Sequence, residues 1–173
     1  DDIEIPLVNV LSDMECEGIK MDRDILDDYS KNLQKEIDSI EKGIYEIAGH
    51  EFNIGSPKQV GEVLFDELKV TDKPKKTKSG QYATNEEALQ SIAGKHEIVE
   101  QILEYREVVK LKNTYVDPLP NLINERSGRI HTTFNQVRAA TGRLSSDKPN
   151  LQNIPIRTER GRYIRQAFVP RSD

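Results

Sequence analysis

The chain has 173 residues and a formal net charge of −5, with 35% hydrophobic and 32% charged residues. No apolar run reaches the roughly 20 residues that a membrane-spanning helix needs, and the N-terminus lacks the basic start and apolar stretch of a signal peptide. The single cysteine excludes an internal disulfide, and the three histidines have no cysteine or carboxylate at zinc-ligand spacing. We expect a helix-rich protein of the cytoplasm with no membrane contact.

Charge is distributed unevenly along the chain. Residues 129–173 hold nine Lys and Arg against three Asp and Glu, a net of +6, whereas residues 1–128 hold 16 against 27, a net of −11. Such asymmetry indicates an anionic partner for the basic part. Because neither end resembles a natural start or stop, we also expect the sequence to be part of a longer protein.

Two helices are predicted in the first 50 residues. Apolar residues at helical spacing predict a short amphipathic helix over 6–18, followed by an extended link. Asp22 is a suitable N-cap for a long helix over 22–48. One apolar stripe follows this helix, formed by Leu26, Tyr29, Leu33, Ile37, Ile40, Ile44 and Ile47. Packing against a helix of the same chain is favoured over a homodimeric coiled coil, because three heptads are near the lower limit for the latter.

Capping patterns predict two helices in the middle of the chain. After a turn at 52–55, Ser56 and Gln59 form a capping-box signature around Pro57. Thr84 and Glu87 form a second such signature, for a helix that ends at about residue 93.

Between these helices lies a basic loop near 71–83, with four lysines within positions 73–78. It is either a solvated loop or a tip that touches phosphates. A further long helix is predicted over 97–116, ended by Asp117 and Pro118.

The hydrophobic period changes in the C-terminal part. Alternation predicts a strand of about six residues over 130–135, with 143–145 as a possible antiparallel partner. Residues 149–155 are bounded by prolines and irregular, and 160–168 are predicted helical. The fold class is therefore mainly α with a small β portion (α+β), in which a long antiparallel helical hairpin leads into an incomplete segment.

Catalytic chemistry is absent from the sequence patterns. There is no nucleophile elbow, P-loop or dinucleotide glycine motif, and neighbouring carboxylates on a helix diverge by about 100°. Binding chemistry is richer, with five C-terminal guanidinium groups and three loop amides: Arg143, Arg157, Arg160, Arg162 and Arg165, and Asn150, Gln152 and Asn153. The amides fit either turn capping or ligand contact, and the arginines of the last helix fit a solvated face.

Three runs in this region resemble the start of the palm in family A DNA polymerases: TGRLSS at 141–146, PNLQNIPIR at 149–157 and GRYIRQAF at 161–168. The likeness extends upstream through HTTFNQ at 131–136, KLKNTY at 110–115, Phe52, Asn53 and Ser56, and so covers nearly the whole chain. It implies a helical thumb over 22–117 with the basic loop near its tip. Residues 118–173 would begin a truncated palm, and 1–21 would connect to a preceding domain.

The resemblance also implies roles for individual residues. Arg143, Asn150 and Gln152 match residues that contact the DNA minor groove, and Arg157 matches a residue near the incoming nucleotide triphosphate. Thumb positions that touch the sugar-phosphate backbone are matched by Asn53, Ser56, Lys110 and Lys112. Phosphate contacts position the duplex, whereas groove contacts discriminate between base pairs.

The chain departs from the family pattern at Ala139, at Asp147-Lys148 and in its catalytic inventory. Family members join nucleotides by a two-metal mechanism, in which carboxylates hold Mg²⁺. The motifs that carry those carboxylates lie downstream of Asp173 in the family. The resemblance thus implies Mg²⁺ and deoxynucleoside triphosphates for the parent enzyme, and no cofactor for this fragment.

We therefore expect a monomeric fragment of a template-directed DNA polymerase that grips primer-template DNA and is inactive by itself. Two alternatives come from other classes. A stand-alone helical nucleic-acid-binding module predicts tight, salt-dependent duplex binding by the chain alone. A structural helical hairpin predicts dimerisation through the stripe from Leu26 to Ile47.

Overall fold

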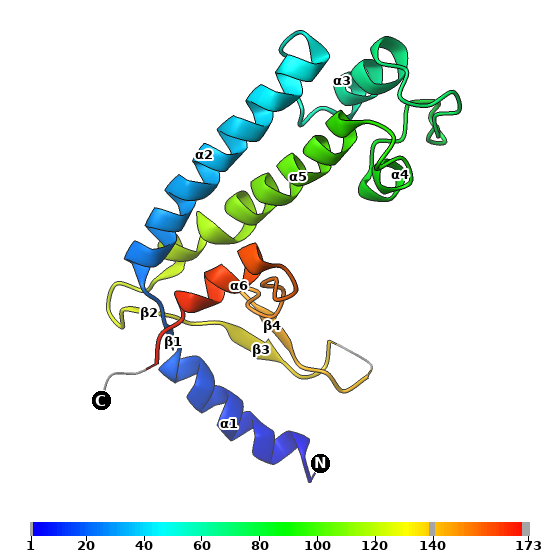
Figure 1. The fold of residues 1–173 in the computed structure, drawn as a ribbon. Helices are drawn as coiled ribbons and strands as arrows, with labels where there is room; N and C mark the ends of the chain where they lie inside the picture. Colours follow the sequence, from blue (N-terminus) through cyan, green and yellow to red (C-terminus); the bar gives the residue numbers. More distant parts are fainter. Residues whose placement is uncertain (1, 139–140, 171–173) are drawn as a thin grey trace. The chain divides into compact units, whose positions relative to one another are not determined.

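The computed structural model describes residues 2–138 and 141–170, so Ala139 lies outside the described residues. It is mainly α with a small β portion, as expected (Figure 1). The helices are α1 (Glu4–Glu17), α2 (Arg23–Ala48), α3 (Pro57–Gly61), α4 (Glu86–Gln90), α5 (Glu97–Leu111) and α6 (Glu159–Gln166). Two π-helical segments, η1 (Glu62–Glu67) and η2 (Lys112–Val116), and a 3-10 turn, η3 (Leu119–Leu122), accompany them. The strands are β1 (Ile19–Lys20), β2 (Arg129–Ile130), β3 (Thr133–Asn135) and β4 (Ser145–Asp147).

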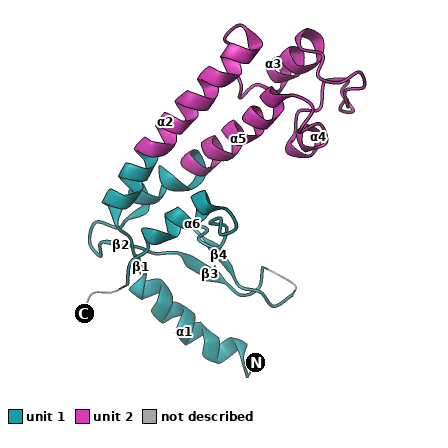
Figure 2. Ribbon diagram, viewed as in Figure 1, with its two compact units in different colours: residues 1–30, 113–173 teal, residues 31–112 magenta. Residues whose placement is uncertain are grey.

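The chain forms two compact units (Figure 2). Unit 1 contains residues 1–30 and 113–173, and unit 2 contains residues 31–112. Unit 1 holds all four strands, whereas unit 2 holds α3, α4, α5 and most of α2.

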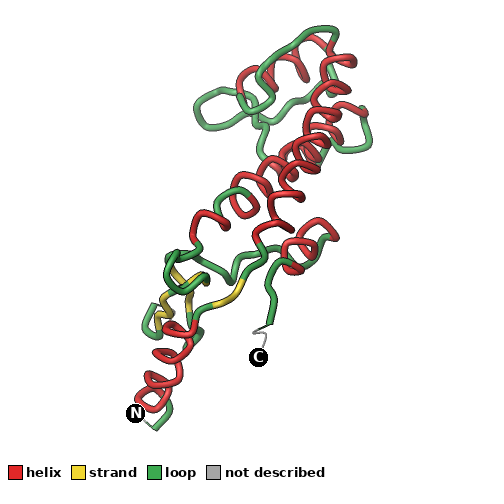
Figure 3. The backbone as a smooth tube through the Cα atoms, turned by 90° about the vertical axis from the view of Figure 1, so that its left-hand side faces the viewer, coloured by secondary structure: helices red, strands yellow, loops and turns green. Residues whose placement is uncertain are grey.

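The apolar stripe of α2 contributes Ile40, Ile44 and Ile47 to the core of unit 2. Ile44 of α2 is fully buried together with Ile98 and Ile102 of α5, and the two helices run antiparallel, side by side (Figure 1). Figure 3 shows in red that helices form most of the regular structure of the chain. Ile54 and Leu64 complete the centre of this core. Burying one such aliphatic side chain stabilises the fold by about 1.5–3 kcal/mol. The stripe is thus used within the chain, as the preferred prediction required.

Local capping explains where the long helix starts and ends. The Asp22 carboxylate accepts hydrogen bonds from the backbone N–H groups of Asp24 and Ile25, at 3.0 and 3.3 Å. After Ala48 the chain reverses at Gly49, whose φ of +81° suits glycine. Both boundaries agree with the prediction.

The second capping-box prediction is wrong. The N-cap of α4 is Asn85, whose Oδ1 accepts a hydrogen bond from Ala88 N, and α4 ends at Gln90. Thr84 is buried and its hydroxyl lies 3.5 Å from the carbonyl oxygen of Pro57. A contact with a distant residue therefore removes Thr84 from the capping role.

The predicted six-residue strand is divided in two. Within unit 1, β2 pairs with β1, whereas β3 pairs antiparallel with β4 in the register Thr133–Asp147, Phe134–Ser146 and Asn135–Ser145. The partner of β3 therefore begins at Ser145, two residues later than expected. The two strands are separated at Thr132, whose hydroxyl forms hydrogen bonds with other residues of unit 1.

Helix α1 is held by residues that follow it by more than 100 positions. Arg129 forms an ion pair with Glu17 at 2.9 Å, and His131 Nδ1 lies 2.8 Å from the carbonyl oxygen of Glu15. Both side chains contact the C-terminal turn, where unpaired carbonyl oxygens favour cations and donors. His131 is thus a structural partner of a backbone group.

Candidate nucleic-acid interface

The first group of candidate residues surrounds the β3–β4 hairpin of unit 1. Arg143 lies two residues before β4 and is exposed. Among residues 2–138 and 141–170, no hydrogen bond or ion pair engages its guanidinium group. Arg138, in the same connection, instead pairs with Asp147 at 2.5 Å. Arg143 is therefore available to a ligand, whereas Arg138 fixes the hairpin.

Two buried hydroxyl groups tie the hairpin to the loop at 149–155. Thr132 Oγ1 lies 2.6 Å from Ser146 Oγ and 2.8 Å from the carbonyl oxygen of Pro149. Ser146 Oγ also accepts a hydrogen bond from Leu151 N at 3.2 Å. Sequence reasoning missed this pair, although a threonine on the apolar side of a predicted strand was a signal for a buried polar contact.

We expect Ser146→Ala to lower the free energy of unfolding by about 1–2 kcal/mol, because it leaves the part-buried Leu151 N–H and the buried Thr132 hydroxyl without this partner. Ser145→Ala is the matched control, since Ser145 Oγ is buried and makes no hydrogen bond among the described residues. It should change stability by less than about 0.5 kcal/mol. Urea unfolding followed by circular dichroism measures both; equal losses would contradict the assignment.

The loop after the hairpin displays two amides next to Arg143. Asn150 Oδ1 accepts a hydrogen bond from Gln152 N at 3.1 Å, and Gln152 Nε2 donates to the carbonyl oxygen of Leu144 at 3.2 Å. The turn-capping alternative from the sequence is therefore observed, and each amide uses only one of its groups for it. The Nδ2 protons of Asn150 and the Oε1 acceptor of Gln152 remain for a ligand.

The far end of this loop is fixed by two long side chains of unit 1. Tyr115 donates its hydroxyl to the carbonyl oxygen of Asn153 at 2.8 Å, and Arg165 of α6 donates to that of Ile154 at 3.4 Å. Arg165 therefore does more than cover a solvated face. Arg157 is exposed in the turn before α6, whose N-cap is Thr158.

The second group of candidate residues lies in unit 2. Asn53 Oδ1 accepts from Gly55 N at 2.9 Å, and Ser56 Oγ caps α3 by accepting from Gln59 N at 3.5 Å. Gln59 does not complete the capping box, because its Oε1 accepts from Asn53 N at 2.6 Å. The turn uses the acceptors of Asn53 and Ser56, so their donor groups are suited to an anion.

Two lysines of this group lie elsewhere in unit 2. Lys110 is exposed in the last turn of α5, and Lys112 is half-buried at the start of η2. The turn that carries Asn53 packs near the other end of α5, since Ile54 shares a core with Ile98. From Ile98 to Lys110 the helix rises roughly 18 Å at 1.5 Å per residue. The four positions therefore form two separate contact points.

A pH-dependent contact supports the turn that carries Asn53. His50 Nε2 lies 2.8 Å from the Glu67 carboxylate and Nδ1 lies 3.1 Å from the carbonyl oxygen of Glu51. Both neighbours are acceptors, so both nitrogens need a proton. The hydrogen bond with Glu67, and then that with Glu51, raises the pKa of His50 above its usual 6.5.

We expect this contact to stabilise unit 2 fully below pH 6.5 and to be lost as pH rises through the raised pKa of His50 in the folded protein. The difference in Tm between the original chain and Glu67→Gln should therefore shrink between pH 5.5 and 8.5. Glu46→Gln, which removes only the exposed pair with Lys42, should show a difference that does not change over this range. A constant difference for Glu67→Gln would contradict the prediction.

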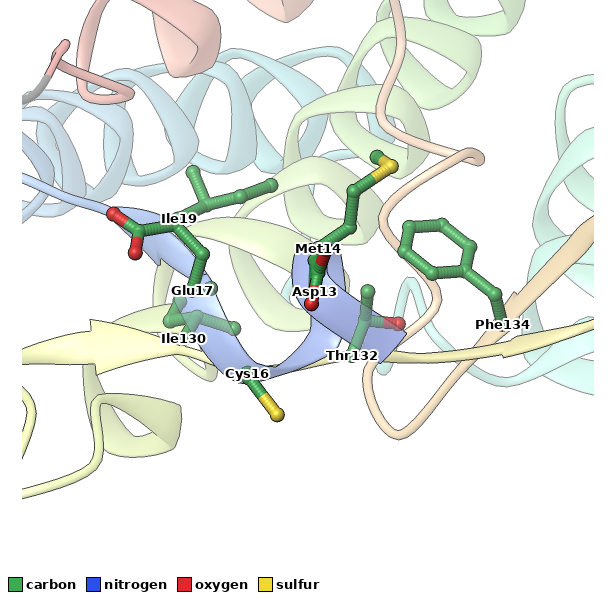
Figure 4. Close-up of a pocket in the computed structure, with 9 residues that line it drawn as sticks. Asp13, Met14, Cys16, Glu17, Ile19, Ile130, Thr132 and Phe134 are labelled. Atoms are coloured by element: carbon green, nitrogen blue, oxygen red, sulfur yellow. The ribbon is translucent and has the colours of Figure 1, made fainter. Parts of the chain in front are cut away.

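A pocket in unit 1 is lined by residues other than the candidate DNA-contacting residues. Its volume is about 640 Å³, and its lining combines apolar side chains with the carboxylates of Asp13 and Glu17. Figure 4 shows Met14 of α1 and Phe134 of β3 on one side, whereas the Cys16 thiol points the other way. In the described part of the chain, no three His, Cys, Asp or Glu residues gather as a metal site. Likewise, no helix of that part is long and apolar enough to cross a membrane.

Comparison with known proteins gives concordant matches. The profile of DNA polymerase family A matches residues 23–173. The chain is 50% identical over 168 residues to the thermostable DNA polymerase I of Thermus filiformis, and 50% identical over 169 residues to the DNA polymerase I of Geobacillus stearothermophilus. These matches cover 97% and 98% of this chain, but only 20% and 19% of the relatives. The chain thus spans about a fifth of their length.

A solved structure shares the fold. The POL domain of Pol1 from M. smegmatis, in complex with DNA primer-template and dNTP, superposes with a TM-score of 0.84 at 48% sequence identity. The match covers 96% of this chain and 29% of that one.

Proposed function

The chain belongs to DNA polymerase family A, and from this premise we propose that it is the part of a bacterial DNA polymerase I that holds primer-template DNA during synthesis. Residues 22–117 act as the thumb, residues 118–173 begin the palm, and residues 1–21 connect them to a preceding domain. The whole enzyme works in the cytoplasm as a monomer, with deoxynucleoside triphosphates as substrates. The observation that carries the proposal is the exposed guanidinium of Arg143 beside the Asn150–Gln152 loop.

The geometry of that loop supports a role in the minor groove. Purine N3 and pyrimidine O2 are acceptors in every base pair, so a donor placed there senses the shape of the pair without reading its sequence. Arg143 and the Nδ2 group of Asn150 are such donors, and the Thr132–Ser146 contact fixes the loop that carries them. Arg157, exposed before α6, approaches the incoming triphosphate.

The unit 2 residues supply contacts of another kind. At one contact point, Asn53 and Ser56 donate hydrogen bonds to a phosphate. At the other, separated from it along α5, Lys110 and Lys112 neutralise further phosphates. Because only the lysines carry charge, they set the salt dependence of binding, whereas the neutral donors set the register of the duplex.

Fluorescence anisotropy with a labelled primer-template duplex tests this function. The logarithm of the binding constant should fall linearly with that of the salt concentration, and replacing Lys110 and Lys112 by glutamine should reduce the slope by about 2. A matched control is Lys42→Gln, which removes a lysine paired with Glu46 on α2. An unchanged slope in the double variant would oppose the assigned contacts.

Primer extension tests the complementary part of the proposal. The chain alone should extend no primer with Mg²⁺ and all four nucleotides, because the described residues offer no cluster of metal ligands. Extension that persists after removal of contaminating host polymerase would overturn the proposed inactivity of this fragment.

A further inference from the structure

A second basic site lies in unit 2, at the basic loop. A pocket of about 330 Å³ opens between α4 and the basic loop. The exposed residues Lys73, Lys75 and Lys95 line its rim, and the buried residues Phe65 and Ile92 form its floor. No acidic residue lines it within the described part of a chain that has 30 Asp and Glu.

The loop that carries two of these lysines is anchored. Ala83 N donates to the carbonyl oxygen of Lys75 at 2.9 Å, and Lys76 pairs with Tyr82 across a small hairpin. Tyr82 in turn donates its hydroxyl to Asp66 at 2.5 Å. Lys75 thus lies at the fixed base of the hairpin, whereas Lys78 lies at its tip and does not line the pocket.

The third lysine comes from another segment, after α4. Lys95 Nζ lies 3.5 Å from Thr71 Oγ1, which also lines the pocket. The Thr71 hydroxyl accepts from the lysine and keeps its own proton for a ligand. Three cations around a low-dielectric floor concentrate a positive potential inside the pocket, which favours a multiply charged anion.

We propose that this pocket is a second nucleotide-binding site, which takes a terminal phosphate monoester together with its nucleobase. Lysine ammonium groups act as point charges that suit phosphate. The apolar floor formed with Phe65 suits the face of a base, and the volume is at the lower end of those typical for small-ligand pockets. The phosphate belongs either to a free nucleotide or to the phosphorylated end of a nucleic-acid strand.

The site is distinct from the proposed grip on the duplex. It uses none of the eight residues assigned to groove, triphosphate or backbone contacts, and it needs no base-paired partner. Its occupancy can be measured with small ligands, so failure of the duplex proposal and failure of this one are distinguishable.

Nuclear magnetic resonance titration of the ¹⁵N-labelled chain tests the proposal. Deoxyadenosine 5′-monophosphate should shift the amide signals of Thr71, Ser91 and Lys95 with saturation, and bind about tenfold more tightly than inorganic phosphate. Deoxyadenosine, which lacks the phosphate, should leave them unchanged. The double variant Lys75→Gln/Lys95→Gln should weaken nucleotide binding at least tenfold, whereas Lys78→Gln should not.

A further ligand in the same titration identifies the source of the phosphate. Tighter binding of a 5′-phosphorylated oligonucleotide than of deoxyadenosine monophosphate supports a strand end, and equal or weaker binding supports a free nucleotide. Absence of saturable shifts, or equal weakening by Lys78→Gln, overturns the site. Displacement of the nucleotide by an acidic peptide of equal affinity overturns the assignment to a nucleotide.

Discussion

Replacement of Gly161 by valine should lower the free energy of unfolding by about 3 kcal/mol. Gly161 is buried in the first turn of α6, where an added Cβ would lie 2.6 Å from Pro155 Cβ and 2.8 Å from the Pro155 carbonyl oxygen. The obstacle includes backbone atoms, so the helix or the loop before it must move. Movement would also disturb the Ile154 carbonyl that Arg165 contacts.

Gly43→Ala is an informative control for this prediction. Gly43 is in the interior of α2, and an added Cβ there meets only the side-chain end of Gln101, at 2.8 Å. A flexible side chain yields easily, so the gain in helix propensity should stabilise the protein by up to about 1 kcal/mol. Gly161→Ala should destabilise it. Urea unfolding of both alanine variants measures the two effects, and the same sign for both would contradict the steric argument.

Local signals explain which elements the sequence predicts correctly. The apolar stripe lies within α2, and the Asp22 cap and Gly49 flank it directly, so its boundaries follow from nearby residues. Thr84 fails as a cap because its hydroxyl contacts Pro57, 27 residues earlier. Thr132 interrupts a predicted strand for the same reason, since it bonds groups 14 to 17 residues later.

The candidate interface divides in the same way. Resemblance to the family identifies Arg143, Asn150 and Gln152 from one continuous stretch. It does not identify the buried Thr132–Ser146 contact that holds their loop. The alternation of apolar and polar residues predicts only which side chains face the core and which face solvent, and it says nothing about hydrogen bonds between buried hydroxyl groups. The pocket beneath the basic loop is likewise invisible in sequence, since Lys95 joins it from another segment.

Arg143→Ala should have the largest functional effect in a complete family A polymerase that contains this sequence. Loss of a well-placed guanidinium contact in a groove costs about 1–3 kcal/mol, which corresponds to a fall in kcat/KM of about 5- to 150-fold. The loss should appear in kcat more than in KM, because the groove contact aligns the primer end when the chemical step begins. The kcat/KM of Arg143→Lys should lie between those of the unmodified enzyme and Arg143→Ala, since lysine keeps the charge but lacks the planar guanidinium group.

The control for this prediction separates position from charge. Arg126 is exposed in the turn before β2, so Arg126→Ala removes the same charge from a position outside the loop at 149–155. Its kcat/KM should stay within about twofold of the unmodified enzyme, because salt screens an exposed charge over about 10 Å. Single-turnover extension from matched and mismatched primers completes the test. Because the donor reads the shape shared by correct pairs, Arg143→Ala should slow matched extension more than mismatched extension. Equal rates for Arg143→Ala and the unmodified enzyme with both primers would remove Arg143 from the groove and leave the 149–155 loop as a structural turn.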